Sequence, residues 1–248
     1  MTQTCTTPPA SDNSGIDWLT IDGDRLRVAQ PANEVFDGFP ERFLEVAAVS
    51  SQRAARPDRD IVRAAQFALD EIAELPRSVW RTHFNAILMG DRPSAGLRFL
   101  HAGRILPVLL PEVCAMVDFH KSCAVHHKDI WDHTLQVVDK CPVNLAVRWI
   151  ALMHDTGKVW TRSVNARGKV HFFRHEELGA TLMRGVARRF ELPETLAARV
   201  IYVISNHARA NVYADTWTDS AVRRLIRDMG EHLDDVIAFS QSDYTTKQ

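Results

Sequence analysis

Residues 151–163 read ALMHDTGKVWTRS, an apolar run that stops at a histidine and an aspartate. The apolar residues before His154 recur at helical spacing, so the pattern predicts a helix over 143–156 whose apolar face ends at that histidine. Asp155 comes next, and Lys158 follows one turn later on the same predicted face. The segment therefore predicts a buried helix with an imidazole, a carboxylate and an ammonium group gathered at its end.

The same arrangement, a polar residue on an apolar helical stripe, recurs in four other predicted helices. A lone histidine of this kind is more often structural than a ligand, but burying even one such group without a partner costs a few kcal/mol. One shared metal site would satisfy all of them, and imidazole nitrogens and carboxylate oxygens suit first-row transition metals. The expected metal ligands are His133, His154, Asp155, His175, His207 and Asp243.

Asp155 and Lys158 are the predicted catalytic residues. The two oxygens of the Asp155 carboxylate can bridge two metal ions, with His175 and His207 as ligands of the second ion. A water held by both ions would lose a proton near neutral pH and become the nucleophile. Lys158 is expected to bind the phosphate of the substrate or the charge that develops on it. The alternative for Lys158 is a solvated lysine at a helix end, stabilised by the helix dipole.

The rest of the chain predicts a mostly α-helical fold with a small N-terminal β-hairpin or irregular region. Apolar runs around Asp22-Gly23-Asp24 predict the hairpin, and residues 161–173 predict a turn with short extended flanks. Further helices are expected at about 61–75, 78–89, 94–101, 129–140, 175–190, 193–207, 218–229 and 231–244, and a polar linker or helix start at 51–60. The expected divisions are a disordered leader (1–15), a small N-terminal segment (16–59), a helical neck-like region (60–115) and a helical bundle (116–248).

Composition restricts the function classes. With 248 residues, 46% hydrophobic and 25% charged, the chain is globular rather than disordered or fibrous. A net charge of −1 argues against a nucleic-acid binder that relies on bulk charge, although a local basic patch stays open. The four cysteines include no CxxC pair and indicate reduced thiols in a cytoplasmic protein. The longest apolar run, 146–153, is about half of the roughly 20 residues that a membrane span needs, and no signal peptide is recognisable.

A first histidine, a His-Asp doublet and a distal aspartate together resemble the signature of the HD superfamily of metal-dependent phosphohydrolases. IWDHTLQVVD (130–139), ALMHDTGKVWTRS (151–163) and GKVHFFRHEELGA (168–180) are similar to the HD domain in the body of bacterial tRNA nucleotidyltransferases, the CCA-adding enzymes. PSAGLRFLHAGRILPVLLPEV (93–113) is similar to their helical neck. The resemblance covers roughly residues 60–248 and implies an HD-domain helical bundle that follows a neck.

The resemblance also implies roles for individual residues. It assigns His133, His154, Asp155 and Asp243 to a first metal ion and His175 and His207 to a second. The implied cofactor is one or two divalent transition-metal ions, with Ni, Co, Mn, Fe, Mg and Zn all open. Lys158, Arg162, Arg209 and His127 are the expected substrate-binding residues; the alternative is a solvated surface position for either arginine and for His127. Glu176 and Glu177 are expected to be first-turn helix residues that favour the helix dipole, and either is also a candidate to orient His175.

Three functions stay open at this point. The first is hydrolysis of a nucleotide-type phosphoester, such as a 2′,3′-cyclic nucleotide, a nucleoside monophosphate or an RNA 3′-end phosphate. The second is a non-catalytic RNA-binding relic of a CCA-adding enzyme, and the third is a di-iron HD oxygenase. CCA addition is not expected, because Asp22-Gly23-Asp24 lies in a predicted turn and the nucleotidyltransferase head of the family has no counterpart here. The oligomeric state is left open.

Overall fold

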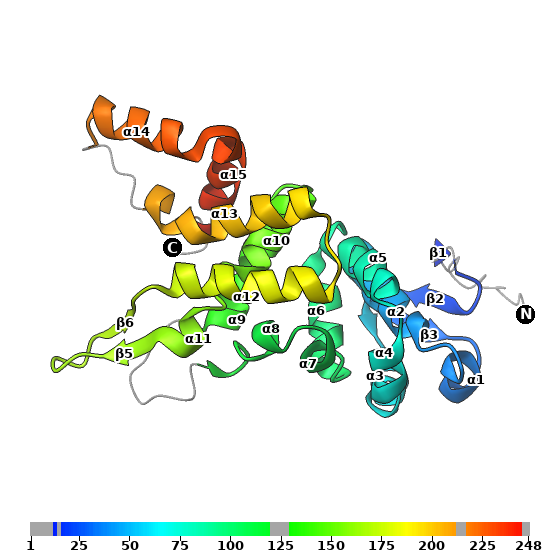
Figure 1. Ribbon diagram of the computed structural model, residues 1–248. Coiled ribbons are helices and arrows are strands. Elements are labelled where there is room, and N and C mark those ends of the chain that lie inside the picture. The colour runs from blue at the N-terminus through cyan, green and yellow to red at the C-terminus, as the bar shows by residue number, and fades with distance from the viewer. Residues whose placement is uncertain (1–11, 14–15, 120–128, 212–216, 245–248) are drawn as a thin grey trace, which may run out of the picture.

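The computed structural model describes residues 12–13, 16–119, 129–211 and 217–244, and most of these residues are helical (Figure 1). This confirms the prediction of a mostly α-helical fold. The β-structure of the described part consists of a four-stranded sheet and a two-stranded sheet. No helix in the described ranges combines the length and the hydrophobicity that crossing a membrane requires.

The N-terminal sheet contains the predicted hairpin. Its strand order is β1 (Asp12–Asn13), β2 (Leu19–Asp22), β3 (Arg25–Val28) and β4 (Arg56–Pro57). β2 and β3 are antiparallel, and Gly23 in their turn has a φ of 61°, which glycine adopts without a steric penalty. The predicted leader is wrong at Asp12–Asn13, because these residues pair with β2. Residues 1–11 and 14–15 lie outside the described residues.

Helix α2 (Glu41–Arg53) lies in a segment for which the sequence pattern predicts no helix. Nearly all residues from 43 to 51 are buried, so no polar face marks the helical period. The prediction of a linker or helix start at 51–60 is confirmed only at its end, where α3 begins at Arg59. It is wrong before that point, because α2 continues to Arg53 and β4 pairs in parallel with β3. The short helix α1 (Ala32–Phe36) was also not predicted.

The predicted helix over 61–75 is two helices, α3 (Arg59–Phe67) and α4 (Leu69–Glu74), which are separated at Ala68. The apolar spacing continues across Ala68 and gave no signal for this break. The predicted helices 78–89 and 94–101 are confirmed as α5 (Arg77–Leu88) and α6 (Pro93–Ala102). Two short helices follow, α7 (Leu106–Leu109) and α8 (Pro111–Cys114).

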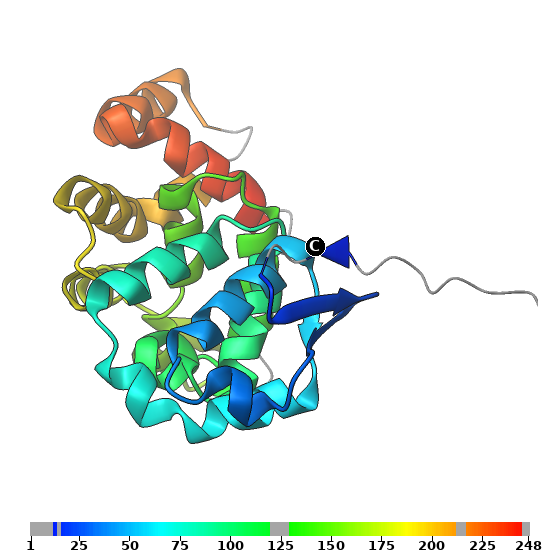
Figure 2. The same ribbon diagram turned by 90° about the vertical axis from the view of Figure 1, so that its right-hand side faces the viewer.

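The remaining helices form the bundle that carries the predicted site. Helix α10 is central: it packs against α9, α13 and α15, and α12 packs along α13 (Figures 1 and 2). The 3-10 turn Gly230–His232 precedes α15, where a continuous helix was expected. The bounds are α9 (Ile130–Lys140), α10 (Leu145–Met153), α12 (His175–Arg189), α13 (Glu194–Asn211), α14 (Asp219–Met229) and α15 (Leu233–Tyr244).

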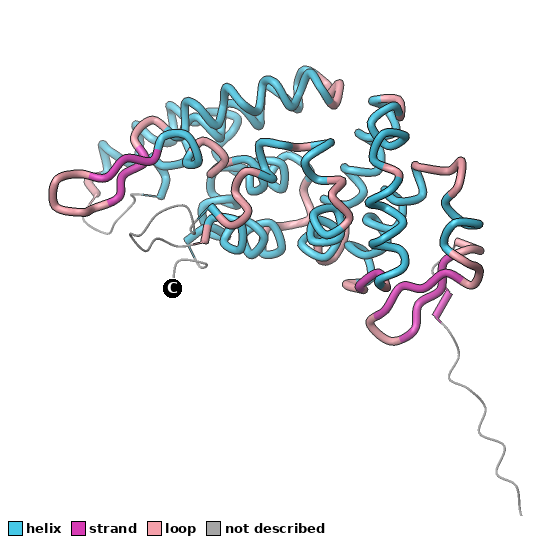
Figure 3. Tube along the Cα trace, turned by 90° about the horizontal axis from the view of Figure 1, so that it is seen from below, coloured by secondary structure: helices cyan, strands magenta, loops and turns pink. Residues whose placement is uncertain are grey.

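Between α10 and α12 the chain forms the short helix α11 (Lys158–Thr161) and a hairpin of β5 (Arg162–Val164) and β6 (Val170–Phe172). The two strands are antiparallel, which confirms the predicted turn with extended flanks. The hairpin projects from the helices at one end of the molecule (Figure 3).

A single hydrophobic cluster links the N-terminal part to the bundle. The ring of Trp149 on α10 lies 5.0 Å from that of Phe84 on α5 and 5.6 Å from that of Phe190, centroid to centroid. Buried residues before and after position 60, such as Phe43 and Leu97, belong to the same cluster. The division proposed near residue 60 therefore falls inside a shared core.

Candidate metal centre

The structure brings the six predicted ligands together. Their ligand atoms form two groups, and within each group these atoms lie within 4.8 Å of one another. The first group joins α9, the end of α10 and α15, and the second joins the turn after α10 with α12 and α13. The members are His133, His154 and Asp243 in the first group, and Asp155, His175 and His207 in the second.

Capping side chains fix where two of these helices begin. Oδ1 of Asn144 accepts hydrogen bonds from the backbone N–H groups of Ala146 and Val147 at 3.0 and 3.3 Å, and α10 begins there. Oδ1 of Asp129 accepts one from the N–H of Asp132 at 3.1 Å at the start of α9. Caps of this kind stabilise a helix by about 1 kcal/mol. They set the register in which each helix presents its histidine.

Helix α10 is shorter than predicted, and the turn that follows it brings Gly157 against the start of α12. The helix ends at Met153, a turn follows, and Lys158 opens α11, so the prediction of one helix to residue 156 with Lys158 on its face is wrong. A Cβ atom at Gly157 would lie 2.1 Å from the carbonyl oxygen of His175. Only glycine permits this approach, which brings His154 and His175 to the same site.

The Asp155 carboxylate lies between the two groups. Its Oδ2 is 3.3 Å from Nε2 of His154 and 3.9 Å from Nε2 of His133. Its Oδ1 is 3.8 Å from Nε2 of His175. In the first group, Nε2 of His133 lies 2.9 Å from Oδ1 of Asp243. Each oxygen of Asp155 thus faces a different set of histidines, as a bridging ligand requires.

Backbone carbonyls set the tautomer of three histidines. Nδ1 of His154, His175 and His207 lies 2.8, 2.9 and 2.7 Å from a carbonyl oxygen three residues earlier in the chain. A carbonyl only accepts, so each Nδ1 carries the proton and donates it. The lone pair of each imidazole is therefore on Nε2, the atom that faces the other ligands.

Burial and neighbouring charges give Asp155 and three of the histidines the protonation states that metal ligands need, and they shift the pKa of His154 in the opposite direction. Burial lowers the pKa of His133 and His175, and it lowers the pKa of His207 to about 3. Burial by itself would raise the pKa of Asp155, but His154 and Lys158 hold it well below its usual value. For His154, burial opposes the charge, yet the adjacent carboxylate raises the pKa. The carboxylate is thus ionised, and three of the imidazoles are neutral near pH 7.

Two buried ligand atoms favour a bound cation. Nε2 of His154 and Oδ1 of Asp155 form no hydrogen bond with any described residue. An unsatisfied buried polar atom costs about 1–3 kcal/mol, and a cation would accept both lone pairs. The donor set of imidazole nitrogens and carboxylate oxygens fits a first-row transition metal. The residues present therefore fit the predicted metal.

Lys158 lies beside the carboxylate that both groups face. Its Nζ is 2.7 Å from Oδ2 of Asp155 and 5.7 Å from the ring centroid of Phe172. One quarter of the Lys158 side chain is exposed, so its ammonium group borders both the buried ligands and solvent. This position lets Lys158 meet a negatively charged substrate.

Two of the other predicted substrate-binding residues have contacts within the protein. The guanidinium of Arg162 lies 4.7 Å from the ring centroid of Phe119. Arg209 donates to Oδ2 of Asp228 at 2.6 Å, so its charge is paired within the protein. His127 lies outside the described residues. Their roles toward substrate stay predictions.

Two further side chains adjoin the site. The ring of Phe239 lies 5.0 Å from that of His154 and 5.8 Å from that of His207. Phe239 was not predicted, although it precedes Asp243 by four residues and so shares its helix face. Oε2 of Glu176 lies 3.2 Å from Nδ1 of His175, the atom that also contacts the carbonyl of Phe172, and Glu177 pairs with Arg174. The role of Glu176 in orienting His175 stays a prediction.

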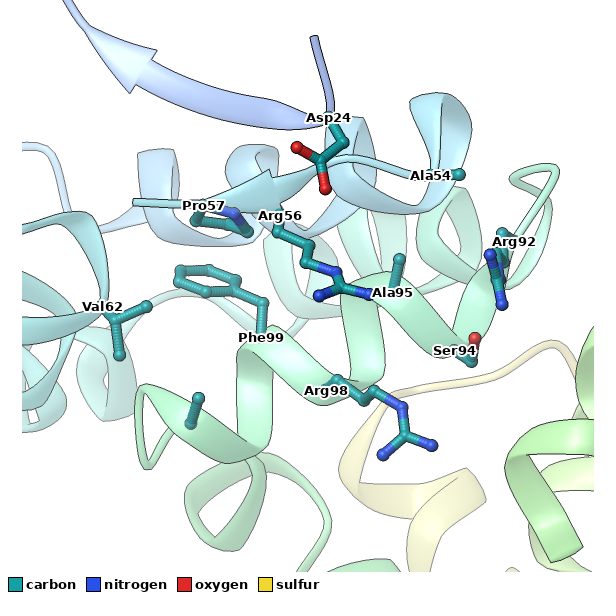
Figure 4. A pocket seen from close by; sticks show the side chains of 11 residues that line it. Asp24, Ala54, Arg56, Pro57, Val62, Arg92, Ser94, Ala95, Arg98 and Phe99 are labelled. Atoms are coloured by element: carbon teal, nitrogen blue, oxygen red, sulfur yellow. The ribbon is translucent and has the colours of Figure 1, made fainter. Parts of the chain in front are cut away.

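A cavity of about 620 Å³ lies apart from this centre (Figure 4). It is bordered by the N-terminal hairpin, α3 and α6, and Arg56, Arg92 and Arg98 extend along its wall. None of the six ligands lines it. Arg92 and Arg98 are paired with carboxylates of α9, at 3.6 and 2.9 Å, so most of the charge in this cavity is neutralised.

Comparison with known proteins identifies the family of this region. Residues 130–239 match the family model of the HD domain, which covers α9, α10, α12, α13 and the first part of α15. Five of the six ligands lie inside this range, and Asp243 lies four residues beyond it. The chain carries an HD domain. HD domains bind divalent metals, in agreement with the two ligand groups of the structure.

The HD-containing region is homologous to bacterial tRNA nucleotidyltransferases. The CC-adding tRNA nucleotidyltransferase of Thermus thermophilus is 33% identical over 176 residues, which cover 67% of this chain and 40% of the relative. The multifunctional CCA protein of Pseudomonas paraeruginosa is 29% identical over 195 residues, which cover 74% of this chain and 46% of the relative. The chain thus spans less than half of the length of these relatives.

A solved structure of a tRNA-processing enzyme with CTP has a similar fold. The TM-score is 0.50 at 12% sequence identity, and the match covers 90% of this chain and 56% of the other. At this identity the likeness shows the fold alone. The sequence relationship and the fold together confirm the resemblance that the motifs indicated.

Proposed function

We propose that this protein is a metal-dependent phosphohydrolase that acts on nucleotide-type phosphate esters, such as 2′,3′-cyclic nucleotides or nucleoside monophosphates. The observation that carries the proposal is the position of Asp155, an ionised carboxylate between two groups of buried ligands with Lys158 beside it. The HD domain supports the hydrolase class. The nucleotidyltransferase relatives, which act on tRNA according to their names, support a nucleotide or RNA substrate.

The residues that would hold metal are the six ligands described above, with Asp155 shared. A bound divalent ion would act as a Lewis acid that polarises a phosphoryl oxygen and lowers the pKa of a water. The chain itself orients the ligands, because the carbonyls of Ala151, Phe172 and Ile204 hold three imidazoles by Nδ1.

Lys158 supplies the charge toward substrate. Its ammonium group reaches solvent and contacts the Asp155 carboxylate, so it is placed to bind a phosphate that approaches the ligands. As negative charge grows on the phosphoryl oxygens in the transition state, this contact strengthens. The buried histidines around Asp155 exclude bulk water and keep the local dielectric low, which increases the effect of that charge.

Metal content and turnover test the proposal together. Elemental analysis of the purified protein is combined with assays of 2′,3′-cyclic AMP and nucleoside monophosphates in the presence of Mn²⁺, Co²⁺, Ni²⁺, Mg²⁺, Fe²⁺ or Zn²⁺. We expect one or two metal ions per chain and metal-dependent phosphate release, both lost in Asp155→Asn. His101→Gln, an exposed residue of α6, is the matched control and should change neither.

Two results would overturn the proposal. Absence of metal and of turnover would favour the RNA-binding alternative. Metal without phosphate release, but with oxygen consumption in the presence of Fe²⁺, would favour the di-iron oxygenase.

A further inference from the structure

The segment that joins α11 to α12 concentrates positive charge. From Lys158 to Arg174 the sequence contains no aspartate or glutamate, in a chain whose net charge is −1. Its lysines and arginines are Lys158, Arg162, Arg167, Lys169 and Arg174. The proposed hydrolysis uses Lys158. It does not explain the positive charge of the β5–β6 hairpin.

The two faces of the hairpin differ. Alternate residues of a strand point to the same side, so Lys169, His171 and Phe173 share one face of β6 and its flanks. The rings of His171 and Phe173 stack with centroids 5.0 Å apart and an interplanar angle of 7°. Phe173 is 70% exposed, so its ring offers an open aromatic surface. The other face carries Phe172, which packs toward Lys158 and the core.

Two cations at the hairpin tip are available to a ligand. Arg167 and Lys169 are exposed, and their side chains make no ion pair or hydrogen bond with a described residue. The other charges nearby are engaged, since Arg174 donates to Glu177 and Lys158 contacts Asp155. The tip therefore presents two unneutralised positive charges next to the stacked rings.

The hairpin is attached to the candidate metal centre at both ends. Lys158 opens the short helix that leads into β5, and the carbonyl of Phe172 in β6 accepts the hydrogen bond from Nδ1 of His175. At about 3.3 Å per residue, the stretch from Lys169 to Phe173 is about 13 Å long. The strands project from the bundle into solvent (Figures 1 and 3), so the cationic and aromatic face runs from the exposed tip toward the ligands.

We propose that the β5–β6 hairpin binds single-stranded nucleic acid, with backbone phosphates at Arg167 and Lys169 and one base stacked on Phe173. Such a combination of cations and an exposed ring suits single strands, because only an unpaired base can stack on a side chain. The hairpin then directs the phosphorylated end of the strand to the metal centre, a statement that rests on the proposed function. Stacking on one ring is tolerant of base identity, so little sequence preference is expected.

Fluorescence anisotropy of labelled 12-nucleotide oligouridylate and oligothymidylate, in EDTA and over a series of salt concentrations, tests this inference. Arg167→Ser/Lys169→Ser should weaken binding at least fivefold and reduce the slope of log affinity against log salt by about 1.4, since each phosphate contact on a single strand contributes about 0.7. Phe173→Ser should weaken binding about fivefold or more with the salt slope unchanged. Arg53→Ser/Arg59→Ser removes two exposed charges from α2 and α3 and should have no effect.

The inference would be overturned if the control variant lost as much affinity as Arg167→Ser/Lys169→Ser. It would also be overturned if all hairpin variants bound with the affinity of the wild type. If the protein bound heparin as tightly as the oligonucleotides, and Phe173→Ser did not change this affinity, then the hairpin would be a general polyanion surface and the inference would be wrong. Hydrolysis of 2′,3′-cyclic AMP by the same variants is measured in parallel and should stay within twofold of wild type. Oligonucleotide binding without hydrolysis would refute the proposed function but support the role of the hairpin in binding. Hydrolysis without oligonucleotide binding would support the proposed function and refute the role of the hairpin.

Discussion

Nζ of Lys158 lies 2.7 Å from Oδ2 of Asp155, in a pair whose two side chains differ sharply in exposure. The lysine side chain is 25% exposed and the carboxylate 2%. The carboxylate also faces His133, His154 and His175 at 3.3–3.9 Å. Lys158 is therefore the point at which the charge of the buried centre meets solvent, and in the proposed function its ammonium group would be the first to meet a substrate phosphate.

Removal of this charge should slow hydrolysis without emptying the centre. In Lys158→Met we expect kcat for 2′,3′-cyclic AMP to fall about 10²- to 10³-fold, the range observed when one preorganised charge or donor is removed. Metal content should stay at the wild-type value, because the six ligands are untouched. Lys140→Met, at the exposed end of α9, is the matched control. Loss of metal in Lys158→Met, or unchanged kcat, would contradict the role assigned to this lysine.

The shared position of Asp155 predicts an unequal effect of ligand substitutions. His133→Gln and His207→Gln each remove a ligand from one group only, so metal stoichiometry measured by elemental analysis should fall in part. Asp155→Asn removes the negative charge between both groups and should abolish binding of all tightly held metal. An Asp155→Asn variant with more metal than either histidine variant would show that the carboxylate does not join the groups.

The sequence was sufficient to select six residues that the structure brings together, because five of them lie on apolar helical stripes whose period is visible in one dimension and Asp155 adjoins one of the five. His207 and Asp243 could be assigned to the site without knowledge of how α13 and α15 pack. Interactions between distant segments were not predictable in this way. The ion pair of Arg209 with Asp228 joins α13 to α14, a contact that the one-dimensional pattern does not show.

Elements with no visible period were also missed. Helix α2 is buried on nearly all sides, so its residues lack the polar face that identifies a helix. The end of α10 was misplaced because the apolar pattern continues to His154, and the close approach of Gly157 to His175 in the following turn is not visible in the sequence.

The buried histidines predict that the metal-free protein loses stability in mild acid. The folded pKa of His207 is lowered to about 3 from a reference of 6.5, so between these values the unfolded chain binds more protons. The stabilisation is complete above about pH 6.5 and decreases as the pH falls toward 3. His133 and His175 act in the same direction, and His154, whose pKa is raised, opposes them.

Urea unfolding in EDTA checks this pH dependence. The urea midpoint should be lower at pH 5 than at pH 7.5. The difference should be smaller in His207→Gln, because the side chain at position 207 no longer titrates in this range. Parallel pH profiles of the variant and the wild type would exclude His207 as a source of the effect.

From the close approach of Gly157 to His175, we expect that one added methyl group can separate the two ligand groups. In Gly157→Ala the new Cβ would meet the backbone oxygen of His175 at 2.1 Å, and neither backbone segment is free to move without displacing the start of α12. We expect a loss of about 1–3 kcal/mol in the free energy of unfolding, a typical cost of overpacking, together with reduced metal content.

Gly185→Ala is the matched substitution on α12, because no heavy atom lies within 4 Å of the added Cβ. Inside a helix this change should stabilise the protein by roughly 0.5–1 kcal/mol and leave metal content unchanged. The two alanine variants therefore separate helix propensity from the contact at the site. If Gly157→Ala were as stable as wild type and retained its metal, then the close approach of the turn to His175 would not be what holds the second ligand group in place.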